Sequence, residues 1–207
     1  MPIHSVITGD IVNSTKLPGA LEKSLVKAIH EIFQPYPFEF YRGDSFQAYI
    51  REGAKSLQKV LLCRTVAIGL TPDDSEPISD VRISIGIGEI EGSVAVLGSA
   101  KGEAFLLSGR SFDELEKTEA RLIITSGNNL ANTGLQVIAD YINAIFKMMT
   151  GKQAEVIFEL LKGQTQQEVA KLLKRSKSTI HQHVISGRWN EVEKLLKQYE
   201  NIINQLL

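Results

Sequence analysis

Two aspartates lie next to apolar, strand-like runs and have the chemistry to bind a divalent cation. Asp10 follows residues 3–8 and lies in the phrase Gly-Asp-Ile-Val-Asn-Ser-Thr at 9–15, while Asp44 precedes the apolar run 45–50. We expect both carboxylates to emerge at strand ends beside polar loops, where paired carboxylates bind Mg²⁺ together with a phosphate ligand. Aspartate is also common in turns, so a structural role as a turn residue is the alternative.

A second candidate functional region is the basic stretch 171–188, which contains no acidic residue. Its basic residues are Lys171, Lys174, Arg175, Lys177 and Arg188. Residues 151–207 hold nine Lys and Arg against six Glu, a net charge of +3, so residues 1–150 carry −4 of the total −1. A basic patch on a nearly neutral protein is typical of a nucleic-acid contact, although short basic runs are also common on solvated helices.

Apolar periodicity predicts a mixed α+β framework for the first part of the chain. Strands are expected at 3–8, 37–42, 45–50, 81–87, 94–97 and 121–125, and helices at 18–34, 53–70 and 102–117. Gly43 and Asp44 are predicted to form a hairpin turn. The resulting order of strands and helices resembles a ferredoxin-like core, in which helices cover one face of an antiparallel sheet.

The remainder of the chain is predicted to be entirely helical. The polar segment 126–134 is rich in turn residues and suggests a boundary between a domain at 1–130, a connecting helix at 131–150 and a domain at 151–207. Helices are expected at 152–162, 165–173, 176–186 and 189–206. The Leu/Ile stripes of 135–149 and 189–206 are typical of core helices, and their near-heptad spacing also fits a dimer seam.

The helices around residues 165–186 have the pattern of a pair set at a steep angle. Thr165 and Glu168 form a capping box, and Ser176 can cap the following helix. Apolar residues of the first helix are expected to pack against those of the second: Val169, Ala170 and Leu173 against Ile180 and Val184. A helical hairpin with no DNA contact, or a relic that binds protein, is the alternative to a DNA-binding unit.

This segment, with its lead-in Leu-Lys-Gly-Gln-Thr at 161–165, resembles the helix-turn-helix of bacterial transcription regulators. The resemblance implies that the second helix is the recognition helix, with bases contacted by Lys177, Ser178, His181 and Gln182 and phosphates by Arg175 and Thr179. The sequence departs from that pattern in the turn, where Lys174 and Arg175 stand in place of the usual glycine and aliphatic residue.

Residues 3–125 resemble the class III nucleotide cyclases in three phrases, at 9–15, 43–46 and 82–90. The resemblance implies that Asp10, Asp44 and the carbonyl of Ile11 bind one or two metal ions, Mg²⁺ or Mn²⁺. It also implies that the amides of Asn13, Ser14 and Thr15 cradle the phosphates of a nucleotide or similar ligand.

The positions that recognise purine and ribose in that family differ here. Phe40, Ser99 and Leu106 replace the expected polar residues, and Arg110 matches the arginine that would stabilise a transferring phosphoryl group across a dimer interface. A misplacement of about 1 Å costs on the order of a hundredfold in rate, so these replacements argue against cyclisation. Arg110 is therefore the one catalytic candidate, and only for an active enzyme.

Composition and apolar runs bear on the cellular location of the protein. No run of about 18 apolar residues is present, and the N-terminus lacks a basic stretch followed by an apolar one. The single cysteine, Cys63, lies in an apolar run and is expected to be a buried thiol. We therefore expect a cytoplasmic protein that does not associate with membranes.

The whole arrangement resembles the SatD-like proteins, a cyclase-like domain followed by a helix-turn-helix. We predict a homodimeric DNA-binding transcriptional regulator, in which a degenerate cyclase-like domain senses a nucleotide-like molecule or mediates dimerisation. The alternative is a metal-dependent nucleotide-processing enzyme with a helical oligomerisation domain. A third hypothesis is a protein-interaction module in which both ancestral sites are silent.

Overall fold

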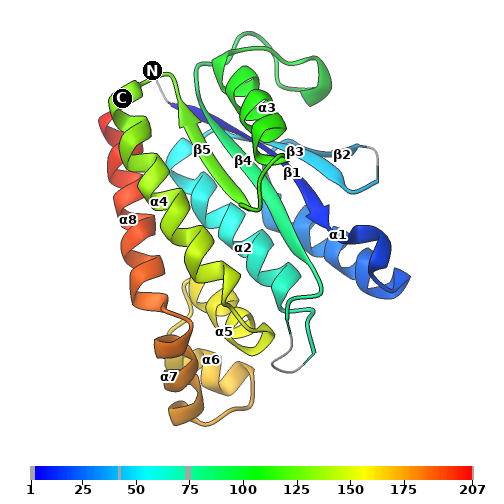
Figure 1. The fold of residues 1–207 in the computed structure, drawn as a ribbon, viewed down its shortest axis with the longest axis vertical. Helices are drawn as coiled ribbons and strands as arrows, with labels where there is room; N and C mark the ends of the chain where they lie inside the picture. Colours follow the sequence, from blue (N-terminus) through cyan, green and yellow to red (C-terminus); the bar gives the residue numbers. More distant parts are fainter. Residues whose placement is uncertain (1–2, 42, 73–75, 207) are drawn as a thin grey trace.

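The computed structural model describes residues 3–41, 43–72 and 76–206 (Figure 1). The strands are β1 (His4–Val12), β2 (Phe38–Tyr41), β3 (Ser45–Ile50), β4 (Asp80–Gly88) and β5 (Leu122–Ser126). The helices are α1 (Gly19–Phe33), α2 (Ser56–Ile68), α3 (Glu103–Leu115), α4 (Asn129–Lys147), α5 (Gly151–Leu161), α6 (Gln166–Leu172), α7 (Lys177–Ser186) and α8 (Trp189–Gln205). Short 3-10 turns occupy Ser14–Lys16, Gly53–Lys55 and Leu97–Ser99. Within these ranges, no helix combines the length and apolarity needed to span a membrane.

The fold is a mixed α+β arrangement around one five-stranded sheet with the strand order β2-β3-β1-β4-β5. All neighbouring strands are antiparallel except β4 and β5, which run parallel. The central strand β1 places Asp10 opposite Ser45 of β3 and Arg82 of β4. Asp10 therefore has side-chain neighbours from both adjacent strands.

The two faces of the sheet differ in character because side chains alternate along each strand. Ile7 and Ile85 face the main hydrophobic core, which includes residues of α1, α2 and α4. The opposite face is polar and carries α3, where the hydroxyls of Thr8 and Ser108 lie 2.7 Å apart. A Cβ on Gly86 would lie 2.3 Å from the carbonyl of Ala104, so this glycine allows α3 to pack directly on β4.

The main hydrophobic core continues from the sheet into the C-terminal helices. Leu135 of α4, Ile157 of α5 and Tyr199 of α8 all belong to it. A second, smaller cluster joins α5, α6 and α7, and consists of Val156, Leu160, Val169, Ala170, Ile180 and Val184. Trp189 packs against both clusters. The α6–α7 pair is thus supported by α5 at the end of the molecule opposite α3 (Figure 1).

Several predicted elements need correction. Residues 94–97 form no strand; they lead into the 3-10 turn at Leu97–Ser99, with Val96 exposed, because both edges of β4 are already occupied by β1 and β5. The polar segment 126–134 belongs largely to α4, whose first turn is capped by the side chain of Asn128, which accepts a hydrogen bond from the backbone of Ala131. The last residue of the predicted strand 37–42 lies outside the described residues.

Candidate functional site

Asp10 lies inside a strand and not at its end. β1 continues to Val12, so the predicted loop at 9–17 begins four residues later than expected. Gly9 lies within the strand because packing requires a glycine there: a Cβ would lie 2.7 Å from the ring of Phe46 and 2.9 Å from the carbonyl of Arg82. The side chain of Asp10 therefore projects onto the polar face of the sheet, beside α3.

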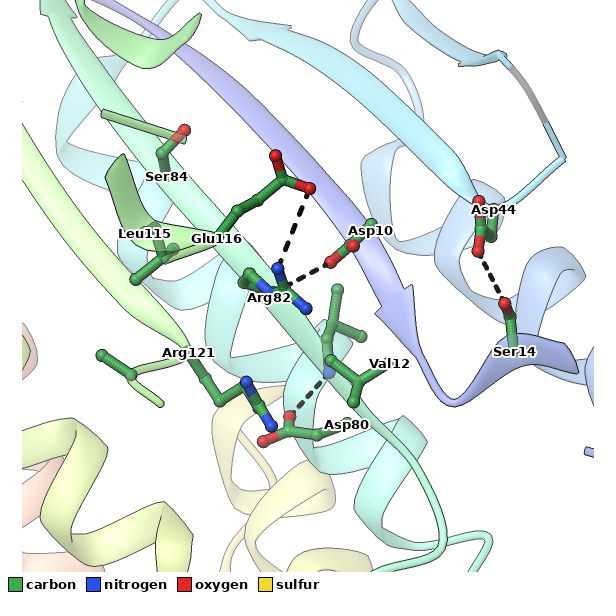
Figure 2. Close-up of polar contacts among 12 residues, drawn as sticks. Asp10, Val12, Ser14, Asp44, Asp80, Arg82, Ser84, Leu115, Glu116 and Arg121 are labelled. Atoms are coloured by element: carbon green, nitrogen blue, oxygen red, sulfur yellow. Dashed lines mark hydrogen bonds and ion pairs between the residues drawn. The ribbon is translucent and has the colours of Figure 1, made fainter. Parts of the chain in front are cut away.

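The nearest charged partner of Asp10 is an internal cation. Nε of Arg82 lies 3.6 Å from Oδ1 of Asp10, and Nη1 of the same guanidinium lies 3.8 Å from Oε1 of Glu116 (Figure 2). Both distances exceed hydrogen-bond length, and Oδ1 of Asp10 and Nε of Arg82 are buried without a hydrogen-bond partner. The carboxylate is thus partly neutralised by charge, while one of its oxygens stays unsatisfied.

Burial raises the pKa of the Asp10 carboxyl above its ordinary value of 3.8. The guanidinium of Arg82 acts in the opposite direction, while the nearby carboxylates of Asp44 and Glu116 add to the increase. Desolvation and like charges both favour the neutral acid, so this position favours either a bound proton or a further cation.

Asp44 occupies the turn between β2 and β3, as predicted, and its carboxylate faces a different group. Oγ of Ser14 donates a hydrogen bond to Oδ2 of Asp44 at 2.6 Å, and the amide of Ile11 donates to the Asp44 carbonyl at 3.2 Å. Figure 2 shows Asp44 directed at Ser14 and Asp10 directed at Arg82. Among the residues that the structure describes, no group of three or more His, Cys, Asp or Glu side chains is arranged to hold a metal ion. Metal binding by Asp10, Asp44 and Ile11 stays a prediction.

The residues expected to cradle phosphates form the turn after β1. Asn13 adopts a left-handed conformation with φ 61°, and its side-chain amide donates to the carbonyl of Ile78 at 3.4 Å. Ser14 is buried and its hydroxyl is engaged by Asp44, while Thr15 is exposed. The turn is therefore held in place by contacts within the chain, and phosphate binding here stays a prediction.

The other residues singled out by the cyclase resemblance make no hydrogen bond or ion pair with Asp10 or Asp44. Phe40 packs its ring 5.1 Å from that of Phe38 and 5.6 Å from that of Phe46, so it contributes to the core. Leu106 is half exposed on α3. Arg110 is exposed on the same helix and makes no hydrogen bond or ion pair with the described residues.

The six residues predicted to contact DNA fall into two groups. Lys177, His181 and Gln182 are exposed on α7 and make no hydrogen bond or ion pair within the described part of the chain. Ser178, also exposed, lies with its hydroxyl 2.8 Å from that of Ser176. The other two residues have internal roles: Arg175 forms an ion pair with Glu155 of α5 at 2.7 Å, and Thr179 donates its amide to the capping hydroxyl of Ser176 at 3.0 Å.

The turn between α6 and α7 explains the two departures from the expected pattern. Lys174 takes a left-handed conformation with φ 51°, the role usually given to glycine. The amide of Arg175 donates to the carbonyl of Ala170 at 3.0 Å, and its guanidinium is bonded to Glu155. The turn is thus tied to α5 by an ion pair in place of an aliphatic contact.

Comparisons with known proteins found similar structures but no match in sequence. No protein-family model and no curated protein matches the chain. The fold resembles bacterial adenylyl cyclases. Two solved structures, both described as those of a bacterial light-regulated adenylyl cyclase, match with TM-scores of 0.40 and 0.39 at 15% and 17% identity. Each match covers 60% of this chain, but 76% of the first and 43% of the second. Similarity of this degree has no bearing on activity.

Arg82 and Glu116 are the site residues that the sequence did not reveal. Arg82 alternates with Val81 and Ile83, so the pattern of β4 does predict that it faces away from the apolar core. Its pairing with Asp10 depends on the register of β1 and β4, which are separated by about seventy residues and are aligned only by the tertiary fold.

Proposed function

We propose that this chain is a transcriptional regulator that binds DNA through α7. The observation that carries the proposal is the outer face of that helix, where Lys177, His181 and Gln182 are exposed and unpaired within the described residues. On the inner face, Ile180 and Val184 are buried against α5 and α6. A helix that packs on the protein with one face and exposes polar side chains, including the cationic Lys177, on the other is suited to insertion into the major groove.

In this proposal α6 and α7 form a helix-turn-helix with α7 as the recognition helix. Gln182 suits adenine and Lys177 suits guanine, while Ser178 and His181 can approach neighbouring base edges. Arg175 and Thr179 lie at the start of α7, where phosphate contacts are usual, although Arg175 would have to share its guanidinium with Glu155. Two copies of the chain in a homodimer would set the spacing of two half-sites.

The role we propose for the sheet domain is ligand sensing or dimerisation. Its first four strands with α1 and α2 have the order expected of a ferredoxin-like, cyclase-type core. In this proposal Asp10 and Asp44 would bind Mg²⁺ or Mn²⁺ together with a nucleotide-like ligand, and the pairing of Asp10 with Arg82 is the internal contact that binding would have to replace. Such a ligand would compete with Arg82 for Asp10 and with Ser14 for Asp44.

The proposal is tested by fluorescence anisotropy with labelled random-sequence duplex DNA at low salt. We expect the wild-type chain to bind, and a triple variant with Lys177→Gln, His181→Ala and Gln182→Ala to bind more than tenfold more weakly, since the lost contact of the charged Lys177 alone removes about 1–3 kcal/mol. Lys23→Gln, which removes an exposed charge on α1, is the control and should bind as the wild type does. Equal binding by the triple variant would refute DNA recognition by α7.

The second candidate is a metal-dependent nucleotide-processing enzyme. The observation in its favour is Asp10, whose Oδ1 is buried without a hydrogen-bond partner and whose pKa is raised by burial. Incubation of the full chain with Mn²⁺ and each nucleoside triphosphate would reveal cyclic nucleotide or phosphate release. A product that disappears in Asp10→Asn and in Asp44→Asn would establish the enzyme; no product, or a product unaffected by both variants, would exclude it.

A further inference from the structure

A cavity of about 500 Å³ lies at the end of the sheet where β1 ends and β4 and β5 begin. Its walls come from these strand ends, from α2 and from the C-terminal half of α4, and include Val12, Asp80 and Phe146. The volume lies within the range of about 300–1,000 Å³ that is usual for small-molecule sites. None of the residues implicated in DNA contact lines it, and of the aspartate site only Asn13 does.

A buried guanidinium lies in the wall of this cavity. Arg64 of α2 is 1% exposed, and its Nε and Nη2 donate to the two oxygens of Asp80 at 3.1 and 2.7 Å. The guanidinium also lies over the ring of Phe146, 4.7 Å from its centroid. Nη1 of Arg64 is buried and has no hydrogen-bond partner, which is costly for a charged donor.

The charges around the cavity do not cancel. Asp80 is paired with Arg64 and also accepts the amide of Val81 at 2.7 Å, and Glu119 is paired with Lys147 at 3.4 Å. Arg121 is half-buried, and its guanidinium makes no hydrogen bond or ion pair with the described residues. Figure 2 shows this side chain reaching from the start of β5 toward Asp80. Among the described residues that line it, the cavity therefore has one more positive than negative side chain, and the charge of Arg121 also acts on the more distant Asp10.

The backbone at the start of β5 is fixed by two hydrogen bonds with α4. The side chain of Asn143 on α4 accepts a hydrogen bond from the amide of Arg121 at 3.2 Å and donates to the carbonyl of Leu122 at 2.9 Å. The backbone of Arg121 is thus fixed at the cavity wall while its side chain stays available. A fixed backbone lowers the entropy cost of using that side chain to bind a ligand.

We propose that this cavity binds a small organic anion that carries a carboxylate or phosphate group on an apolar body. The anionic group would be held by Arg121 and by the unsatisfied side of Arg64, where it would supply the acceptor that Nη1 lacks. The apolar body would lie against Val12, Ala144 and Phe146, which also line the cavity. This site is separate from α7 and does not depend on DNA binding.

The test is a calorimetric titration of the full chain with phenyl phosphate and, separately, with benzoate. We expect one saturable site for at least one of them, and the tighter of the two identifies the anionic group. Arg121→Gln removes the free charge, and Ala144→Phe fills the cavity from an exposed helix position. Each variant should weaken binding by about tenfold or more. Arg51→Gln removes an exposed arginine outside the cavity and should leave the affinity unchanged.

Three results would overturn the proposal. The first is the absence of saturable binding of either anion to the wild-type chain. The second is equal affinity in Arg121→Gln and Arg51→Gln, which would show that the anion is not held at this cavity. The third is unchanged affinity in Ala144→Phe, since a filled cavity cannot bind its ligand. Circular dichroism of each variant establishes that the helices are intact before the affinities are compared.

Discussion

The aspartate site and the outer face of α7 differ in whether their polar and charged side chains have partners within the chain. At the aspartate site, Asp10 lies 3.6 Å from Arg82 and Asp44 accepts a hydrogen bond from Ser14 at 2.6 Å. On α7, Lys177 and His181 face solvent with no partner in the described ranges. One region uses its polar groups within the chain, and the other leaves them available.

This difference indicates where binding a second molecule requires the least rearrangement. A ligand at the aspartate site must displace Arg82 or Ser14 and compensate for their lost contacts. A ligand that binds the outer face of α7 would displace only water from the exposed side chains. The helix itself is already anchored, because Ile180 and Val184 on its inner face are buried. The predictions below test each half of this comparison, from the largest expected effect to the smallest.

The first prediction concerns the buried side of α7. Ile180→Ala should lower the free energy of unfolding by about 2–5 kcal/mol, because it leaves a cavity in a small cluster. Ile185→Ala, on the exposed side of the same helix, should change it by less than about 0.5 kcal/mol. Urea denaturation measures both, and equal effects of the two substitutions would mean that α7 is not anchored as described.

The second prediction concerns the internal cation of the aspartate site. Arg82→Gln leaves Asp10 half-buried without its counter-charge and should cost about 1–3 kcal/mol at neutral pH. Lys27→Gln breaks an ion pair of similar length, 3.8 Å from Glu31, whose side chains are 78% and 64% exposed, and should cost about 0–0.5 kcal/mol. If the two variants are equally stable, Arg82 does not neutralise Asp10.

The third prediction concerns pH and has opposite signs for Asp10 of the aspartate site and for Glu168 of α6, the helix that supports α7. Burial raises the pKa of Asp10 above 3.8, so the folded chain binds this proton more tightly than the unfolded chain, and the contribution of Asp10 to stability falls as pH rises. Asp10→Asn should therefore gain stability relative to the wild type as pH increases above 3.8. Thermal unfolding at a series of pH values measures the difference.

Glu168 supplies the opposite case in the α6 capping box. The backbone amide of Thr165, followed by its hydroxyl, lowers the pKa of Glu168 below 4.5, so the ionised form stabilises the fold, and this contribution is lost as pH falls. Glu168→Gln should consequently lose stability relative to the wild type as pH rises through the same range. The same trend in both variants would contradict the contrast between the strained carboxyl of Asp10 and the stabilising carboxylate of Glu168.

Local patterns in the sequence were sufficient to predict most of the helices. The apolar spacing and the capping residues Thr165 and Ser176 placed α6 and α7 within one or two residues of their observed bounds, and both caps are present. These signals are local, because a helix is stabilised by residues three or four positions apart. The packing of Val169 against Ile180 followed from the same spacing and is confirmed.

The surroundings of Asp10 could not be predicted, because they depend on contacts between distant strands. Gly9 has the appearance of a loop residue, yet it lies inside β1, where a side chain would collide with the ring of Phe46. The partner of Asp10, Arg82, is set by strand register, and nothing near Asp10 in the sequence specifies it. The expected strand at 94–97 is wrong for a related reason: the turn at Glu91 and Gly92 suggests a hairpin with β4, but both edges of β4 pair with β1 and β5.

The central claim, that α7 binds DNA through its exposed cationic face, is tested most directly by salt dependence. The logarithm of the DNA-binding constant is measured against the logarithm of the salt concentration for the wild type, Lys177→Gln and the control Lys23→Gln. If Lys177 contacts a phosphate or a base edge at the DNA surface, Lys177→Gln should lower the slope by about one, and Lys23→Gln should not change it. An unchanged slope in Lys177→Gln, or wild-type binding that does not respond to salt, would contradict the account.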